Sequence, residues 1–221
     1  MVRQARSEAT RRRIIDAAVD LFGEVGYQST GLGDIIDRAQ MTKGALYYHF
    51  DSKESLATAI VEEGADLALT AFRNVSEPSA PALENMIHGL FVVADLVVTD
   101  KVVRTGAQLL RAFGGFNPAT VAAHGDLLTE MVIQARQAIV EDDLRDGLDP
   151  VAVGEVIVES LLGAEMVSNL ASGGADLIER IARAWSLLLP AIVSEGSLVY
   201  FREFLARESL RHAPRGGDQS A

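Results

Sequence analysis

Cysteine is absent from this chain of 221 residues, so a disulfide framework, a thiolate metal site and a thiol nucleophile are all excluded. The absence fits a reducing cytoplasm, where we expect the protein to act. Long apolar runs are also missing: LLLPAIV at 187–193 falls far short of the roughly 18 residues that a membrane span needs. Asp16 and Asp20 interrupt the apolar segment after the basic N-terminus, which argues against a signal peptide. We therefore expect no membrane partner.

Aromatic residues are few, at 6%, but hydrophobic residues make up 48% of the chain and charged residues 23%. This is the usage of a globular protein, and it excludes a mainly disordered chain. A packed core is expected.

Positive charge is scarce overall, since the formal net charge is −11, but it is concentrated near the N-terminus. Residues 1–50 carry seven Lys and Arg against six Asp and Glu, whereas residues 51–221 carry 13 against 25. An acidic protein repels a polyanion at long range, so any nucleic-acid contact must come from this N-terminal segment. A solvated basic tail is the alternative for the arginines at 3, 6, 11, 12 and 13.

Hydrophobic periodicity predicts an all-α fold and requires no strand. From Arg11 a helix should run to the glycines at 23–26, because Ile14, Ala18, Leu21, Phe22 and Val25 recur at helical spacing. Two short helices at 32–39 and 43–49, with Thr30 and Thr42 as N-caps, then flank a turn at Gln40-Met41. This arrangement is a helix-turn-helix unit.

The rest of the chain predicts seven further helices, at 52–73, 81–98, 100–113, 118–143, 150–171, 175–194 and 196–212. Glycine pairs at 114–115 and 173–174 end two of them. Asn117-Pro118 and Asp149-Pro150 each supply a cap followed by proline at the first helical position. The segment NVSEPSAP at 74–81 reads as a linker, and residues 213–221 as a disordered tail.

The short helix at 43–49 combines an apolar anchor with a small, aromatic and basic outer face. At 100° per residue, Leu46 and Phe50 lie on the same side, while Gly44 and Tyr48 face away from them. Small residues let the backbone approach a surface closely, and the neighbouring hydroxyl and ammonium groups can contact bases or phosphates. These features suit a DNA major groove. For His49 the alternative is a partly buried imidazole, and for Tyr47 and Tyr48 it is packing against the first helix.

The stretch GYQSTGLGDIIDRAQMTKGALYYHFDSKESL, residues 26–56, resembles the DNA-binding signature of TetR-family transcriptional repressors. Gly31 departs from the family pattern by replacing a hydroxyl residue. Gln40 stands where the family has glycine, and if that position needs positive φ, it costs on the order of 1 kcal/mol. The chain further resembles the γ-butyrolactone-receptor branch of the family in three stretches, RQARSEATRRRIIDAAVDLF, TKGALYYHF and VVRTGAQLL. That branch carries a Trp in the helix corresponding to 118–143, which is absent here, since Trp185 is the only Trp.

The resemblance implies an N-terminal DNA-binding domain at 1–52 and a helical effector-binding and dimerisation domain at 53–212. It assigns base reading to Lys43, Gly44, Ala45 and Tyr47, and phosphate contacts to Thr30, Thr42, Tyr48, His49 and Lys53. Arg3 and Arg6 either add contacts as a flexible arm or only solubilise the chain. The resemblance implies a homodimeric repressor that binds a palindromic operator. A small, largely apolar effector, of which a γ-butyrolactone is one candidate, would release it from the DNA.

An effector pocket should be mostly apolar with few polar groups. The candidate lining residues are Met86, Leu90, Leu109, Leu110, Phe113, Phe116, Leu127, Met131 and Gln134. Plain core is the alternative for each residue, and the sequence favours it. The segments at 151–170 and 175–194 are apolar on more than one face, which fits either a dimer interface through the C-terminal helices or a deeply buried helix pair.

Catalysis finds no support in the sequence. Its histidines, at 49, 88, 124 and 212, show no metal-binding spacing with one another, and there is neither a Walker-type glycine loop nor a nucleophile elbow. We therefore predict no enzyme activity, cofactor or metal. A regulator of the same fold without small-molecule control is the remaining alternative.

Overall fold

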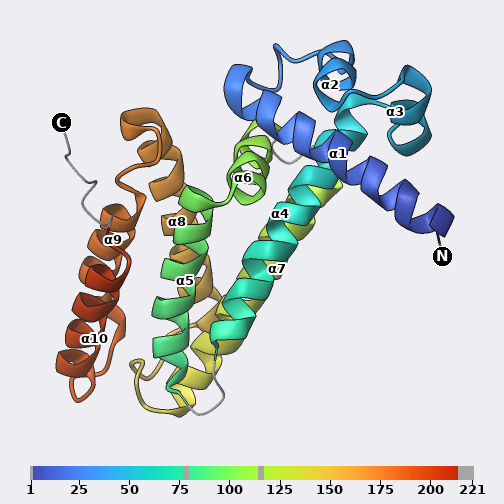
Figure 1. Cartoon of the computed structure of the whole chain (residues 1–221). Coiled ribbons are helices and arrows are strands. Elements are labelled where there is room, and N and C mark those ends of the chain that lie inside the picture. Colours follow the sequence, from blue (N-terminus) through green and yellow to red (C-terminus); the bar gives the residue numbers. More distant parts are fainter. Residues whose placement is uncertain (1, 77–79, 114–116, 214–221) are drawn as a thin grey trace. The chain divides into compact units, whose positions relative to one another are not determined.

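The computed structural model describes residues 2–76, 80–113 and 117–213, which form ten α-helices and contain no strand (Figure 1). The helices are α1 Val2–Val25, α2 Leu32–Ala39, α3 Lys43–His49, α4 Lys53–Val75, α5 Ala82–Thr99, α6 Lys101–Phe113, α7 Pro118–Val140, α8 Pro150–Ser172, α9 Leu177–Ile192 and α10 Leu198–Arg211. The all-α prediction is confirmed, and the helix ends agree closely with the predicted ones except at α1. The glycine pair at 114–115, part of the predicted linker and the tail at 214–221 lie outside the described residues.

The chain is helical from Val2 and not from Arg11, so the predicted flexible arm is wrong for the described residues. Arg6 belongs to an exposed helical turn.

The chain divides into two compact units. Unit 1 consists of Met1–Leu67 and Thr99–Ala123, and unit 2 of Ala68–Val98 and His124–Ala221. This division follows packing, and it places α6 with the N-terminal helices. The functional boundary at residue 52 stays a prediction.

Unit 1 is built on the apolar stripe of α1. Ile14, Ile15 and Ala18 are fully buried, together with Leu46 of α3 and Ile60 of α4. The core needs close approach between α4 and α6, where a Cβ on Gly64 would lie 3.1 Å from the carbonyl oxygen of Val102. The short helices α2 and α3 make most of their contacts with α1. They therefore depend on α1 for support.

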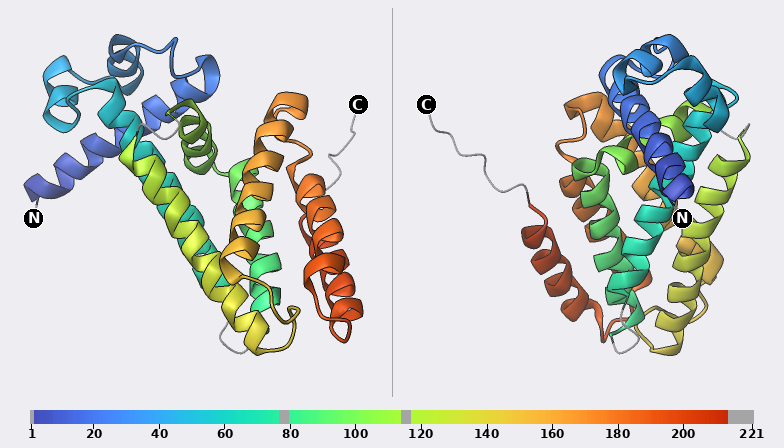
Figure 2. Two further views of the ribbon diagram at one scale, coloured as in Figure 1. Left: turned by 180° about the vertical axis from the view of Figure 1, so that it is seen from behind. Right: turned by 45° about the vertical axis from the view of Figure 1, so that its right-hand side comes forward.

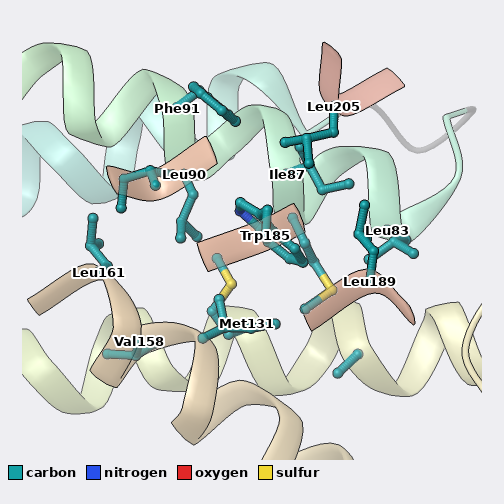
Figure 3. Packing of buried hydrophobic residues seen from close by; sticks show 14 of the residues in the cluster. Leu83, Ile87, Leu90, Phe91, Met131, Val158, Leu161, Trp185, Leu189 and Leu205 are labelled. Atoms are coloured by element: carbon teal, nitrogen blue, oxygen red, sulfur yellow. The ribbon is translucent and has the colours of Figure 1, made fainter. Parts of the chain in front are cut away.

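Unit 2 is a layered helical core around Trp185. Figure 3 shows the indole between Leu90 of α5 and Met131 of α7, with Leu189 of α9 beside it. In α5, Gly89 faces the ring of Phe72 so closely that a Cβ would lie 2.2 Å from it. In Figure 2, α8, α9 and α10 run side by side along this unit, and contacts join each to the next.

One described helix, α5, has the length and mean hydropathy, 1.5, of a membrane span. Polar residues interrupt its sequence, so it contains no long unbroken apolar run. In the structure 56% of this helix is buried inside the protein. Its apolar residues therefore serve the core of unit 2.

Asp176 joins the end of α8 to the start of α9. Its carboxylate accepts hydrogen bonds from the hydroxyls of Ser168 at 2.5 Å and Ser172 at 2.7 Å, and from the guanidinium of Arg180 at 2.9 Å. The Arg180 bond and then the two serine bonds lower the pKa of Asp176. Gly173, with φ of 63°, ends α8 as predicted.

The turn between α2 and α3 contains a strained residue. Gln40 has φ of 53° and ψ of 46°, in the left-handed region that disfavours a residue with a Cβ. Its backbone N–H caps α2 by donating to the carbonyl of Asp37 at 3.1 Å. The position therefore suits glycine.

We expect Gln40→Gly to raise the free energy of unfolding by about 1 kcal/mol, because glycine removes the steric cost of the left-handed conformation. Urea denaturation followed by circular dichroism measures the change. Gln28→Gly is the matched control, since Gln28 is not among the described residues with positive φ, and it should not stabilise the protein. Equal effects of both substitutions would contradict this explanation.

Candidate nucleic-acid interface

Helix α3 begins at a well-formed cap. Thr42 has extended backbone angles, and its hydroxyl oxygen accepts a hydrogen bond from the backbone N–H of Ala45 at 3.2 Å. The predicted N-cap is confirmed. The hydroxyl proton can still be donated outward, to a phosphate for example.

Two side chains fix α3 to the core and leave its opposite face open. Leu46 is fully buried and Phe50 is 4% exposed, and the guanidinium of Arg11 lies over the Phe50 ring at 5.4 Å. Tyr47 and Tyr48 are 43% and 75% exposed, so packing of Tyr48 against α1 is wrong. The helix therefore has one anchored and one accessible side.

The accessible side presents the predicted groups together. Lys43 is exposed, with its ammonium 5.7 Å from the centre of the Tyr47 ring. Gly44 is exposed, and a Cβ there would meet no atom within 4 Å. His49 is half-buried, and its ring packs edge-on against Tyr48 at 4.9 Å. A short, narrow helix with donors and small residues on one side matches the dimensions and chemistry of a major groove.

Thr30 does not lie on this face. It is 2% exposed, and its hydroxyl donates to the carbonyl oxygen of Gly26 at 2.9 Å. The predicted N-cap of α2 is also wrong at Thr30, because Gly31 takes that position and its N–H donates to Asp34 Oδ2 at 2.8 Å. Thr30 therefore stabilises the α1–α2 loop, and its hydroxyl faces the protein interior and not a phosphate.

Lys53 is likewise occupied by the protein itself. Its ammonium donates to the carbonyl oxygens of Tyr27 at 2.8 Å and Thr30 at 2.9 Å, and lies 4.4 Å from the centre of the Tyr27 ring. These contacts tie the start of α4 to the loop after α1. The sequence could not separate this role from a phosphate contact, because both need a cation at this position.

We expect Lys53→Met to lower the free energy of unfolding by about 1–3 kcal/mol, because two carbonyls lose a charged donor. The loss should show in thermal or urea unfolding without DNA. A variant that unfolds like the native chain but binds DNA weakly would instead support the phosphate contact.

The N-terminal arginines also bond within unit 1. Arg13 donates to the carbonyl oxygen of Ala39 at 3.2 Å, and Arg12 pairs with Asp16 at 2.8 Å and with Glu63. Arg38 holds both carboxylate oxygens of Glu24, which lowers the pKa of Glu24. These bonds orient α1 and α2, and the guanidinium groups of Arg12, Arg13 and Arg38 therefore have partners within unit 1.

Comparison with known proteins identifies this architecture. Residues 14–60, which include α2, α3 and the turn between them, match the bacterial regulatory proteins of the tetR family. The chain is 31% identical over 205 residues to the A-factor receptor protein of Streptomyces griseus, a match covering 91% of this chain and 70% of that protein. The chain belongs to the TetR family. It is a DNA-binding transcriptional regulator and not an enzyme.

Solved structures of TetR-family relatives agree over nearly the whole chain. A γ-butyrolactone receptor described as ArpA-like superposes with a TM-score of 0.76 at 28% identity, covering 93% of this chain and 99% of that one. The TetR-family protein CprB of Streptomyces coelicolor, in complex with its operator sequence, gives 0.75 at 29% identity, with coverage of 93% and 99%. Within the TetR family the chain therefore falls in the γ-butyrolactone-receptor branch.

The predicted effector residues fall into both units. Met86, Leu90 and Met131 are buried in the core of unit 2, with Leu127 packed against it. Leu109, Leu110 and Phe113 belong to the core of unit 1, and Phe116 lies outside the described residues. Gln134 lies at a separate surface depression beside Ile133 and Gln137.

Sequence reasoning missed two features of unit 2. Trp185 lines a cavity of about 10 Å³ with Leu90, Ile157 and Leu188, although it was not among the predicted pocket residues. His88, Glu208 and His212 also come together, although the histidines show no metal-binding spacing in the sequence. The one local signal was the spacing of Glu208 and His212, four residues apart on one helical face.

Proposed function

We propose that two copies of the chain bind a palindromic operator and repress transcription, each inserting α3 into the major groove. The accessible side of α3, with Lys43, Gly44 and Tyr47 facing solvent above a buried Leu46, carries this proposal. A symmetric dimer reads two half-sites whose centres lie about 34–36 Å apart or a multiple of that distance. Thr42, Ala45, Tyr48 and His49 complete the proposed contact set.

An apolar face of α8 supports the proposed dimer. Leu162, Met166 and Leu170 are 44%, 48% and 82% exposed in the single chain, and they lie within one side of the helix. On α9, Leu187 is 74% exposed. A face of this kind is typical of a surface that is covered by a partner. A second copy of the same face would bury it symmetrically.

We further propose that the effector is a small molecule with an alkyl part, of the γ-butyrolactone class, bound in unit 2 beside Trp185. Relatives described as γ-butyrolactone receptors suggest the class. The cavity at Trp185 is too small for such a ligand, so binding must displace side chains of α5, α8 and α9. In the proposed mechanism the displaced arrangement binds DNA weakly. By linkage, a ligand that prefers this arrangement weakens DNA binding by the same factor by which DNA weakens ligand binding. Helix α4 has residues in both units and is the proposed lever.

Selection of bound fragments from genomic DNA tests the proposal. We expect a palindromic sequence that binds at nanomolar concentrations, with affinity falling steeply as salt rises. An alkyl-substituted γ-butyrolactone should then release the DNA and change the fluorescence of Trp185, the only Trp in the chain. Operator binding that no lactone weakens would favour a regulator without small-molecule control. We place this activity in the cytoplasm.

A further inference from the structure

A cluster of metal-ligand side chains lies in unit 2, which does not contain α3. His88 comes from α5, Glu208 from α10, and His212 is the C-cap residue of α10. Their nitrogen and oxygen ligand atoms all lie within 4.8 Å of one another. His88 Nδ1 is 2.6 Å from Glu208 Oε2, and His212 Nε2 is 3.7 Å from the same oxygen.

The cluster is shielded from water. The Glu208 side chain is 2% exposed, that of His212 11% and that of His88 23%. A carboxylate so deeply buried is stable only with partners of opposite charge or a bound cation. His212 Nε2 is itself buried and has no hydrogen-bond partner among the described residues. An unsatisfied buried nitrogen directed at a carboxylate and a second imidazole calls for an explanation.

Neighbouring side chains hold the three ligands in place. Arg211 Nη1 donates to Glu208 Oε1 at 2.8 Å and leaves Oε2 to face the two imidazoles. The ring of Phe91 stacks on that of His212, with centroids 5.7 Å apart and planes at 29°. Such outer contacts commonly orient the ligands of a metal ion.

We propose that His88, Glu208 and His212 bind a divalent first-row metal ion, for which Zn²⁺ is the best match. Two imidazoles and one carboxylate form a common zinc ligand set, and water supplies the fourth position of the tetrahedron. With metal–ligand bonds of about 2.1 Å, tetrahedral ligand atoms lie about 3.4 Å apart. Two of the three separations between ligand atoms, 2.6 and 3.7 Å, bracket this value, and the third is at most 4.8 Å, so small shifts of the side chains admit the ion.

Metal binding joins α5 to the C-terminal end of α10 inside unit 2. An ion that binds the folded state and not the unfolded chain stabilises the protein by mass action. Zn²⁺ should therefore raise the melting temperature of the protein. It should bind at one ion per chain. This role is independent of the proposed repression, since it concerns no residue of α3.

The test is a titration of the full chain, purified without a polyhistidine tag and freed of metal with a chelator, with ZnCl₂ in a calorimeter. We expect one saturable site per chain, and with Co²⁺ the visible absorption of a tetrahedral centre. His88→Ala and His212→Ala should each weaken Zn²⁺ binding by at least about 100-fold, because a ligand is lost from the metal itself. Circular dichroism checks that both variants are folded.

His124→Ala is the matched control, because His124 is an exposed histidine of α7 outside the cluster. It should bind Zn²⁺ like the native chain. Absence of a saturable site in the native protein would overturn the proposal. So would equal affinity in the three histidine variants, since the cluster would then be only an ion pair of His88 with Glu208.

Discussion

Replacing Lys43 and Tyr47 together by alanine is expected to weaken operator binding by at least about 100-fold, because each base contact contributes about 1–3 kcal/mol. Both side chains are exposed, and Lys43 lies over the Tyr47 ring at 5.7 Å, so they are placed to contact DNA as a pair. Neither is part of the core, so the free energy of unfolding should change little. Fluorescence anisotropy with the selected operator measures the affinity.

The control for this prediction is an equally drastic double substitution elsewhere, Tyr200→Ala with Arg202→Ala. Both residues are exposed on α10 of unit 2. The control should bind the operator within about twofold of the native chain, as expected for surface residues outside the proposed contact set. Equal losses in the two double variants would contradict the assignment of base reading to α3.

Placing glutamate at both Met166 and Leu170 is expected to separate the dimer and, with it, to abolish tight operator binding. The two side chains are one helical turn apart on the exposed face of α8. In a symmetric interface, the two substitutions would bury four carboxylates without partners, at a cost of several kcal/mol. Light scattering after gel filtration should give the mass of one chain, where the native protein gives two.

Val140→Glu controls for the effect of a new charge, because Val140 is an apolar residue 75% exposed at the end of α7. It should leave the dimer intact. A native protein that is monomeric at micromolar concentration, or a dimer that survives both glutamates, would contradict the role given to α8. The affinity for a single half-site would then decide whether α3 binds DNA without pairing.

Local signals in the sequence predicted most of the fold. Thr42 caps α3, Asp149 caps α8 by accepting from the N–H of Val151 at 2.9 Å, and Gly173 ends α8. Each of these choices depends on one residue and its nearest neighbours. The sequence predicts strain at Gln40 only if its φ is positive, and in the structure its φ is 53°.

Roles that depend on distant partners could not be predicted in this way. Thr30 and Lys53 have the chemistry of phosphate contacts, but carbonyl groups of the loop after α1 accept their hydrogen bonds. His88 and Glu208 lie 120 residues apart in the chain and meet only because α5 and α10 belong to one core. The type of a side chain does not show whether it contacts DNA at the surface or bonds within the protein. That depends on its partner, which only the structure reveals.

The position of α3 on DNA is tested most directly by cleavage from a tethered reagent. Because the chain has no cysteine, Asp51→Cys places a single iron-chelate cleavage reagent just beyond α3, at an exposed residue, and keeps every proposed contact. We predict two symmetric groups of strand breaks on the operator, centred about one helical turn of DNA apart or a multiple of it. Cleavage no stronger than that from the same reagent at Val140→Cys, or spread evenly along the duplex, would contradict insertion of α3 into the major groove.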